Sequence, residues 1–539
     1  MSKILKTLSL LLLLTLGLVK LSWATGNDGI ILQLRSDIDY AHHDGYCSLD
    51  QLHRECGATS VTAISMGKNL YQVRFANADV AEQMIYKYQA HPDVQYAEIN
   101  YALASEKPMD LKTFNLSVQS LSAASLSKAS NRAIVAIVDS GVDYTHTDLK
   151  NFMWVNSGED LDHDGVIEDS EKNSKDDDGD GIIDDFYGAN LCSLTGTSGD
   201  PKDVYGHGTH VAGIVLQNGI NAAGQNGVEI MAVKFLNDSG VGYLVDGAKA
   251  IDYALDHGAK VVNCSWGYNY NSNTLSNVMA KAEQMGVAIV CAAGNYNSDS
   301  PLYPAYYNYS VSVAALDQHG YKASFSNYGN YVDLAAEGVS VYSTYPHNQY
   351  ATLSGTSMAA PKVSGLLAAA WSSQPNLSLQ QILQDIPNAA TDITDPLHTG
   401  ANGYTGKDPY TGYGSLSLNS LLSTLGATTP IVSVASLSST HLSNLMNYPN
   451  PVGAGANTTF GFSSDSNVDV TVKVFTLRGQ LVRQFTTSKS PVGSYVKVVY
   501  DCTDDGGSRL PMDVYLYQVQ AQDSVGTVAS GIGKLVVVN

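Results

Sequence analysis

The central part of the chain, residues 132–424, is predicted to be an α/β domain built on a parallel β-sheet. Several apolar runs there, such as AIVAIVDS, EIMAVKFL and VAIVCAAGN, are continuously hydrophobic rather than alternating, which is typical of strands buried on both faces. Helical patterns lie between them, for example LVDGAKAIDYALDHG, which ends with Gly258 as a helix C-cap. Strands that alternate with helices predict crossover connections, with helices covering both faces of the sheet.

The composition limits the classes of protein to which the chain can belong. It has 539 residues, of which 44% are hydrophobic and 15% charged, and this excludes wholesale disorder and a coiled coil. The net charge of −21 argues against a nucleic-acid partner, because phosphate binding needs a positive surface. Beyond the N-terminal segment no apolar run reaches the roughly 18 residues of a membrane-spanning helix, so no internal span is expected.

Residues 1–24 have the pattern of a cleaved secretory signal. Lys3 and Lys6 precede an apolar run, Leu8–Val19, and small residues stand near Ala24 at the end of the segment. The run is too short to span a bilayer, and its flanks are those of an exported chain. A buried N-terminal helix is the alternative. We therefore expect a secreted, extracellular protein, and its attachment to the cell surface is left open.

Two further folded units are expected on either side of the α/β domain. Residues 25–115 contain strand patterns such as GIILQL and VQYAEINYAL and one helical pattern, VAEQMIYKYQA, which together predict a small α+β unit. A polar, serine-rich stretch at 115–131 is predicted to be a linker. A second linker is expected at 425–445, and the short alternating strands of 446–539 are typical of a β-sandwich.

The six cysteines are too few for the disulfide framework of a small cysteine-rich domain. Cys47 and Cys56 could pair, since export permits oxidation. Cys264 and Cys291 lie inside apolar strand-like runs and are predicted to be buried thiols. No partner is evident in the sequence for the other two, Cys192 and Cys502.

Two glycine-flanked segments of the α/β region carry an aspartate and a histidine. Asp139 ends an apolar strand pattern, and the carboxyl ends of parallel strands are where ligand chemistry gathers; a structural Asx turn is the alternative. His207 stands between Gly206 and Gly208, so another main chain can approach its ring closely. His210, three residues later, is a competing candidate.

A third segment carries a serine. Ser357 is predicted to lie in the first turn of an apolar helix. Pro361 is expected in the same turn, where proline is tolerated because the main-chain N–H groups have no helical partner. The free N–H groups at a helix start can stabilise an oxyanion. An ordinary N-cap serine is the alternative.

Together these residues supply a serine nucleophile, a histidine base and an orienting aspartate. A serine hydroxyl attacks only when a neutral imidazole takes its proton, and a buried carboxylate then stabilises the imidazolium. The order along the chain is Asp, His, Ser, and no G-x-S-x-G segment occurs.

The segments VDSGVDYTHTDL, GHGTHVAGIV and GTSMAAPKVSG resemble the three active-site motifs of the subtilisin-like serine proteases, the subtilases. The resemblance covers about 132–424 and implies that Asp139, His207 and Ser357 form a charge-relay triad. The segment CAAGN resembles a fourth motif of the family, which makes Asn295 the side-chain oxyanion donor.

The resemblance also implies how substrate is bound and how the enzyme matures. Residues 239–243 resemble the edge strand that pairs with the substrate main chain, and Ser265-Trp266-Gly267 resembles the opposite wall of the cleft. The implied substrate-binding residues are Gly240, Gly242, Ser265, Trp266 and Gly267. VQYAEINYAL resembles the end of a subtilase propeptide, which acts as chaperone and intramolecular inhibitor. The last unit resembles Ig-like modules of secreted bacterial proteins, some of which are type IX sorting signals, so cell-surface or secretion machinery is a further partner to consider.

An acidic insert at 156–190 distinguishes the chain from the smallest subtilases. Between Glu159 and Asp185 there are thirteen acidic and two basic residues, a local net charge of −11. Such carboxylates repel one another unless a cation lies between them. A solvated acidic loop is the alternative, and the sequence shows no flanking helices.

Two segments of the insert follow the twelve-residue calcium-loop pattern, in which alternate carboxylates and a central glycine wrap oxygens around one ion. The first fits in full, including Gly165 and Ile167; the second has Tyr187 at the position of the last glutamate. The candidate ligands are Asp160, Asp162, Asp164 and Glu171 in the first segment and Asp176, Asp178, Asp180 and Asp184 in the second.

We therefore expect a secreted serine endopeptidase, made as a pre-pro-enzyme, that acts on protein or peptide substrates and carries structural calcium but no organic cofactor. One alternative is an inactive subtilase-like scaffold that uses calcium and the sandwich to bind surfaces. Another is an esterase with the same triad, since acyl transfer does not itself require an amide.

Overall fold

The computed structural model describes residues 27–36, 38, 40, 48–66, 69–104, 132–223, 227–393, 406–427, 442–448, 457–464, 468–476, 481–490, 495–504, 506–511, 513–523 and 528–537. The predicted signal segment, the linker at 115–131, most of the linker at 425–445 and Cys47 lie outside these residues. The chain divides into two compact units, 1–427 and 428–539, and each is described by itself.

The N-terminal part of the first unit is an antiparallel sheet covered by helices. The sheet order is β2-β3-β1-β4, and β4 continues to a further pairing with β8 (Val241–Tyr243) of the central region. Helix α3 (Ala78–Gln89) begins at Asn77, whose side chain accepts a hydrogen bond from the N–H of Val80. The other elements are β1 (Asn27–Leu34), α2 (Ser48–Cys56), β2 (Ser60–Ala63), β3 (Leu70–Arg74) and β4 (Val94–Ala104).

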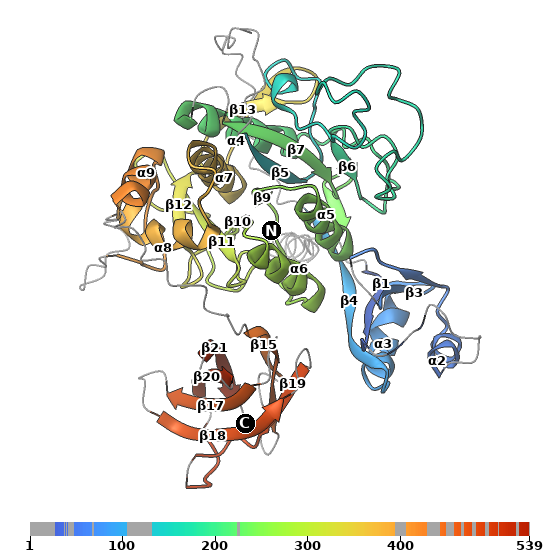
Figure 1. The fold of residues 1–539 in the computed structure, drawn as a ribbon, viewed down its shortest axis with the longest axis vertical. Helices are drawn as coiled ribbons and strands as arrows, with labels where there is room; N and C mark the ends of the chain where they lie inside the picture. The colour runs from blue at the N-terminus through green and yellow to red at the C-terminus, as the bar shows by residue number, and fades with distance from the viewer. Residues whose placement is uncertain are drawn as a thin grey trace, which may run out of the picture. The chain divides into compact units, whose positions relative to one another are not determined.

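The central region is built on a seven-stranded parallel sheet with the order β12-β11-β10-β9-β5-β7-β6 (Figure 1). The strands are β5 (Ala133–Asp139), β6 (Gly188–Asn190), β7 (Val228–Lys234), β9 (Val261–Cys264), β10 (Ala288–Ala292), β11 (Ser310–Leu316) and β12 (Leu334–Glu337). A hairpin of β13 (Val341–Tyr345) and β14 (Gln349–Leu353) follows.

Helices cover both faces of this sheet, which explains the continuous apolar runs (Figure 1). Val135 and Ile137 of β5 belong to the core shared with α4 (His207–Ala223) and α7 (Thr356–Ser373). Ala136 and Val138, the alternate residues, belong to the core shared with α5 (Leu244–Asp256) and α6 (Asn273–Gln284). Successive side chains of a strand point to opposite faces, so both sets must be apolar, and the predicted parallel α/β sheet is confirmed. Helices α8 (Leu379–Ala389) and α9 (Leu418–Ala427) and a short 3₁₀ helix, η1 (Lys150–Phe152), complete the region.

The second unit consists of two antiparallel sheets around one apolar core. Three strands form the sheet β15-β16-β19 and four form the sheet β18-β17-β20-β21. Phe460 of one sheet and Val472 and Val519 of the other lie in the same core, as in the expected β-sandwich. The first strand begins at 442, four residues before the predicted start of this unit. The strands are β15 (Leu442–Tyr448), β16 (Thr458–Ser464), β17 (Val468–Thr476), β18 (Leu481–Ser490), β19 (Tyr495–Tyr500), β20 (Asp513–Asp523) and β21 (Val528–Val537).

The five cysteines within the described residues are all buried free thiols, as expected for Cys264 and Cys291. Cys56 is among them, and Cys47, the partner considered for it, lies outside the described residues. In the part of the chain that the structure describes, no helix is both long enough and apolar enough to cross a bilayer.

Candidate active site

The aspartate, histidine and serine singled out from the sequence lie where one β-strand ends and two α-helices begin. Asp139 is the last residue of β5, His207 is the first residue of α4, and Ser357 is the second residue of α7. Asn295 follows the end of β10. Because β5 and β10 belong to one parallel sheet, their carboxyl ends share the same edge.

Asp139 and His207 form a buried pair. Nδ1 of His207 lies 2.8 Å from Oδ1 and 2.9 Å from Oδ2 of Asp139, and both side chains are fully buried. The main-chain N–H of Ser140 also donates to Oδ1 of Asp139, at 2.7 Å. A carboxylate so placed keeps the proton of a neutral imidazole on Nδ1, which leaves Nε2 as the basic nitrogen.

Two glycines allow this pair to form. A Cβ atom at position 208 would lie 2.1 Å from the carbonyl oxygen of Gly141, so only glycine lets α4 start this close to the end of β5. Gly141 itself has a φ of +100°, and a Cβ there would lie 2.2 Å from the carbonyl oxygen of Pro201. The glycines beside the catalytic candidates are therefore required by close main-chain approach.

Asp203 is a buried carboxylate at this site that the sequence reasoning missed. Its Oδ1 accepts hydrogen bonds from the N–H of Gly206 (2.9 Å) and the hydroxyl of Ser140 (3.0 Å). Its Oδ2 accepts from the N–H and the hydroxyl of Thr209, at 2.9 and 2.6 Å. Burial raises the pKa of Asp203. Its position four residues before His207 is the available signal, because carboxylates are favoured beside the first turn of a helix.

The competing histidine, His210, is placed differently. Its Nε2 donates to the main-chain carbonyl of Ala351 in β14, at 3.0 Å. Burial lowers the pKa of His210 to about 3. The structure pairs Asp139 with His207, while His210 joins α4 to the β13–β14 hairpin.

Ser357 is tied to the segment after β9 by two reciprocal hydrogen bonds. Its hydroxyl donates to the carbonyl of Ser265 at 3.1 Å, and the hydroxyl of Ser265 donates to the carbonyl of Ser357 at 3.0 Å. Pro361 is the sixth residue of α7 and not a member of its first turn, which corrects the prediction. It cannot give the carbonyl of Ser357 the usual helical hydrogen bond, and Ser265 supplies that bond instead.

Asn295 is held by the start of α7. Its Oδ1 accepts from the N–H of Thr356 at 2.8 Å and from the hydroxyl of Thr356 at 3.0 Å. A Cβ atom at Gly355 would lie 3.3 Å from Nδ2 of Asn295. In a side-chain amide only the nitrogen can donate a hydrogen bond, so Nδ2 is the atom of Asn295 on which the predicted oxyanion role depends.

The implied substrate-binding residues take different positions. Strand β8 contains Gly242, where a Cβ would lie 2.3 Å from the carbonyl oxygen of Phe235, and Gly240 precedes β8 with a φ of +72°. The indole of Trp266 is only 2% exposed, packs on Phe235 and donates from Nε1 to the carbonyl of Val138 at 2.9 Å. Its side chain thus lies in the core and not on a cleft wall, so only its main chain is left to face a substrate.

Gly267 completes the segment after β9. A Cβ atom at this position would lie 2.6 Å from Cδ2 of Leu302, so the main chain passes close to that side chain. Glycine is the residue that such an approach permits.

The C-terminal end of β4 pairs with the edge strand β8. The two strands pair antiparallel, with Leu103 opposite Gly242. Nearby, Glu98 accepts hydrogen bonds from the hydroxyl of Ser272 (2.8 Å) and from the N–H groups of Asn273 (2.7 Å) and Thr274 (3.0 Å), at the start of α6. A carboxylate at a helix start is favoured by the free N–H groups and the helix dipole.

A second helix start is capped from the same strand. Oδ1 of Asn100 accepts from the N–H of Val245 at 3.0 Å, in the first turn of α5. Tyr101 stacks on Tyr270 with ring centroids 4.3 Å apart. The N-terminal sheet is therefore joined to the central region through β4 at one edge strand and two helix starts.

The first acidic loop, residues 160–171, is a series of turns without helix or strand. Oδ2 of Asp160 accepts from the N–H of Gly165 at 2.8 Å, and this glycine has a φ of +80°. Carboxylate oxygens of Asp160, Asp162 and Glu171 lie within 4.8 Å of one another, as do those of Asp162, Asp164 and Glu168. Glu168, the ninth residue of the loop, is a ligand candidate that the sequence reasoning missed, although the loop pattern allows a ligand at that position.

The second acidic loop, residues 176–187, gathers its carboxylates differently. Asp178 and Asp180 converge with His257, which follows α5, within 4.8 Å. Asp176 and Asp178 converge with Glu159, which lies outside the loop, and burial raises the pKa of Glu159. Asp184 belongs to none of these groups among the described residues; its Oδ2 accepts from the N–H of Ser174 at 3.1 Å. The first loop and the Glu159 group offer only oxygen donors, which fit a hard cation such as calcium.

Comparison with known proteins agrees with this architecture. Residues 130–414 match the sequence profile of the subtilase family. The chain is 36% identical over 345 residues to the thermophilic serine proteinase of Bacillus sp. (strain AK1), a match that spans 61% of this chain and 76% of that protein. It is 45% identical over 170 residues to thermitase of Thermoactinomyces vulgaris (31% of this chain, 61% of that protein) and 42% identical over 200 residues to subtilisin Savinase of Lederbergia lenta (36% and 74%). The chain belongs to the subtilase family and is a subtilisin-like serine endopeptidase.

Proposed function

We propose that the chain is the precursor of a secreted serine endopeptidase whose nucleophile is Ser357, whose base is His207 and whose orienting carboxylate is Asp139. The observation that carries this proposal is the fully buried contact of 2.8 Å between Nδ1 of His207 and Oδ1 of Asp139, at the start of α4. It leaves Nε2 of His207 to accept the hydroxyl proton of Ser357 as the oxygen attacks a peptide carbonyl.

Charge that develops on the carbonyl oxygen would be met by two kinds of donor. The first is Nδ2 of Asn295, whose oxygen is held by Thr356. The second is the main-chain N–H of Ser357 in the first turn of α7, since the N–H of Thr356 already donates to Asn295 and that of Met358 to the carbonyl of Gly355. Donors fixed before the reaction stabilise the oxyanion without reorganisation. His207 then returns its proton to the leaving amine, and water repeats the sequence to release the acyl group.

The substrate is an extended peptide that adds a strand to β8. Antiparallel pairing of β4 with β8 supports this, since Leu103 opposite Gly242 is main-chain recognition of an extended segment. The same pairing supports residues 25–115 as an intramolecular inhibitor, because a substrate cannot pair with an edge strand that is already occupied. An esterase remains the alternative reaction, and comparing the rates on casein and on a simple ester separates the two.

Calcium is proposed as a structural cofactor of the acidic insert and takes no part in the chemistry. Asp160, Asp162, Asp164, Glu168 and Glu171 would hold one ion in the first loop, where their carboxylates form two groups that share Asp162. The second unit is proposed to serve secretion or surface attachment, because it has its own core. The inactive scaffold is disfavoured, since none of the four positions of the site has lost its functional side chain.

The direct test is Ser357→Ala in the full chain. We expect the variant to have no peptidase activity and to remain uncleaved between residues 105 and 131, as seen by mass spectrometry of the secreted protein. If the purified variant matured normally with no other protease present, Ser357 would not be the nucleophile of self-processing.

A further inference from the structure

The second acidic loop lacks the glutamate that normally closes such a site. In loops of this pattern the twelfth residue supplies a bidentate carboxylate, but here it is Tyr187. The ring of Tyr187 packs against that of Tyr144 with centroids 5.0 Å apart, so it is engaged elsewhere. A cation at this loop needs a carboxylate from another part of the chain.

Glu159 lies in the place where that carboxylate is needed. It precedes the first loop, and a carboxylate oxygen of Glu159 lies within 4.8 Å of carboxylate oxygens of Asp176 and Asp178. Its Oε1 accepts from the N–H of Asp177 at 2.9 Å. Its Oε2 is buried and accepts no hydrogen bond from any described residue, in a side chain that is 0% exposed. A buried carboxylate oxygen in this state is costly unless a positive partner satisfies it.

The segment that carries Glu159 is shaped to receive the second loop. A Cβ atom at Gly158 would lie 2.4 Å from Cβ of Asp178, so only glycine permits this approach. Nδ2 of Asn156 donates to Oδ2 of Asp178 at 2.9 Å and to Oδ1 of Asp185 at 2.8 Å. The contacts of Gly158 and Asn156 with Asp178 therefore hold this segment against the second loop, so the position of Glu159 does not depend on its own side chain alone.

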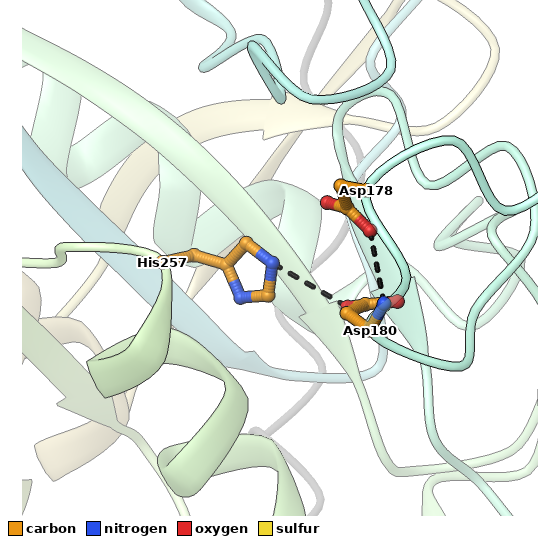
Figure 2. A group of neighbouring side chains, drawn as sticks. All are labelled: Asp178, Asp180 and His257. Atoms are coloured by element: carbon orange, nitrogen blue, oxygen red, sulfur yellow. Dashed lines mark hydrogen bonds and ion pairs between the residues drawn. The ribbon is translucent and has the colours of Figure 1, made fainter.

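Asp180, the fifth residue of the loop, is turned to a different partner (Figure 2). Its Oδ2 lies 3.4 Å from Nε2 of His257, and Nδ1 of His257 donates to the carbonyl of Tyr253 at 2.9 Å. The N–H of Asp180 donates to Oδ1 of Asp178 at 3.1 Å. Asp180 joins the loop to the end of α5 and does not belong to the group formed with Glu159.

We propose that Glu159, Asp176 and Asp178 bind a second calcium ion, with Glu159 in the role of the missing twelfth-position glutamate. The inference rests on the calcium proposal made above for the insert. The ion would fasten residues 156–159 to the second loop, and it would satisfy the buried oxygen of Glu159. The ligand set predicted from the sequence for this loop therefore changes: Glu159 enters, and Asp180 and Asp184 leave.

The test uses Glu159→Gln in the full-length Ser357→Ala protein, which cannot digest itself. Gln keeps an oxygen for the N–H of Asp177 and removes only the charge. In EGTA we expect the variant to melt at a higher temperature than its parent, because the uncompensated buried charge is gone. In calcium we expect it to melt lower, because one ion is lost. Only a calcium ligand should show this reversal. Replacement of a residue with a purely structural role would lower the melting temperature in both conditions, and that result would overturn the proposal.

Calorimetric titration with calcium chloride gives a second readout. The parent should bind two ions in the insert, and Glu159→Gln should weaken one of them. Loss of groups that only support a ligand already weakens metal affinity roughly 10–100-fold, so loss of the ligand itself should do at least as much. The matched control is Asp177→Asn, which removes one charge from the same loop at a side chain that bonds Asn173 and joins no carboxylate group.

The two proposals fail in different ways. Calcium binding that is the same in Glu159→Gln and Asp177→Asn would overturn the assignment of Glu159 and leave calcium in the first loop standing. A parent protein that binds no calcium at all would overturn both.

Discussion

Asp139 in the catalytic core and Asp176 in the acidic insert both accept hydrogen bonds from main-chain N–H groups, yet their surroundings differ. Asp139 is fully buried against the imidazole of His207. Asp176 is half-buried, accepts from Gly179 and Gly181 within its own turn, and faces the carboxylates of Asp178 and Glu159. At Asp139 the core itself supplies the donor partners of the carboxylate, whereas the insert brings like charges together.

The difference indicates which interactions hold each region in its conformation. The core is fixed by apolar contacts of α4 and α7 with the sheet, so the site residues are placed before any ligand arrives. The insert has no helix or strand between 156 and 187 and is held by carboxylates that accept from its own turns. Changes in the core should therefore alter chemistry, and changes in the insert should alter stability.

The substitution Asn295→Ala is the most demanding test of the expectation that changes in the core alter the chemistry. We expect kcat to fall by roughly 10²–10³ with little change in KM, because an oxyanion donor acts mainly in the transition state. Steady-state rates on a peptide substrate measure the two constants separately. A change confined to KM would show that Asn295 binds the ground state and is no oxyanion donor.

Removal of calcium tests the expectation that changes in the insert alter the stability of the protein. A ligand that binds only the folded state stabilises it by about 2.7 kcal/mol at roughly a hundredfold excess over Kd. We expect EGTA to lower the melting temperature of the Ser357→Ala protein, and the double change Asp162→Asn and Asp164→Asn to imitate EGTA. Well below that temperature, kcat of the mature enzyme should be unchanged by EGTA. Identical melting curves with and without calcium would mean that the insert is a solvated acidic loop.

Deletion of everything after Ala427 should have the smallest effect. The second unit has its own core of Phe460, Val472 and Val519, so catalysis should not depend on it. We expect the truncated enzyme to keep the full-length kcat and KM on a peptide. A truncated protein that folds, as judged by circular dichroism, but does not cleave peptide would place part of the catalytic apparatus in that unit.

The sequence was most informative where local pattern and position in the fold coincide. The strand that ends at Asp139 and the helix whose first turn contains Ser357 were both predicted from their apolar residue patterns. The direction of the Trp266 side chain could not be predicted in this way, because it depends on which face of the sheet edge packs on Phe235. The sequence around Trp266 is compatible both with a side chain on the cleft wall and with a side chain in the core.

Partners that come from distant or unpatterned positions were also beyond the sequence. Glu159 meets Asp176 and Asp178 only because the chain folds back past Gly158. Asp203 bonds Ser140 and Thr209 in a buried network, and its position before the helix that begins at His207 is the one signal in the sequence for it. Glu168 was accessible in principle, since it occupies a fixed place in the loop pattern.

The hydrogen bond from Ser265 to the carbonyl of Ser357 has a consequence for the order in which the molecule is assembled. Pro361 leaves that carbonyl without its helical partner, so α7 alone does not satisfy the carbonyl of Ser357. Ser265 arrives with β9, which lies in the sheet between β5 and β10. A half-folded chain can thus contain the helix without containing a competent serine. If Ser357 is the nucleophile, as proposed, we expect proteolytic activity to appear only once β9 has joined the sheet, which would protect partly unfolded chains from digestion by one another.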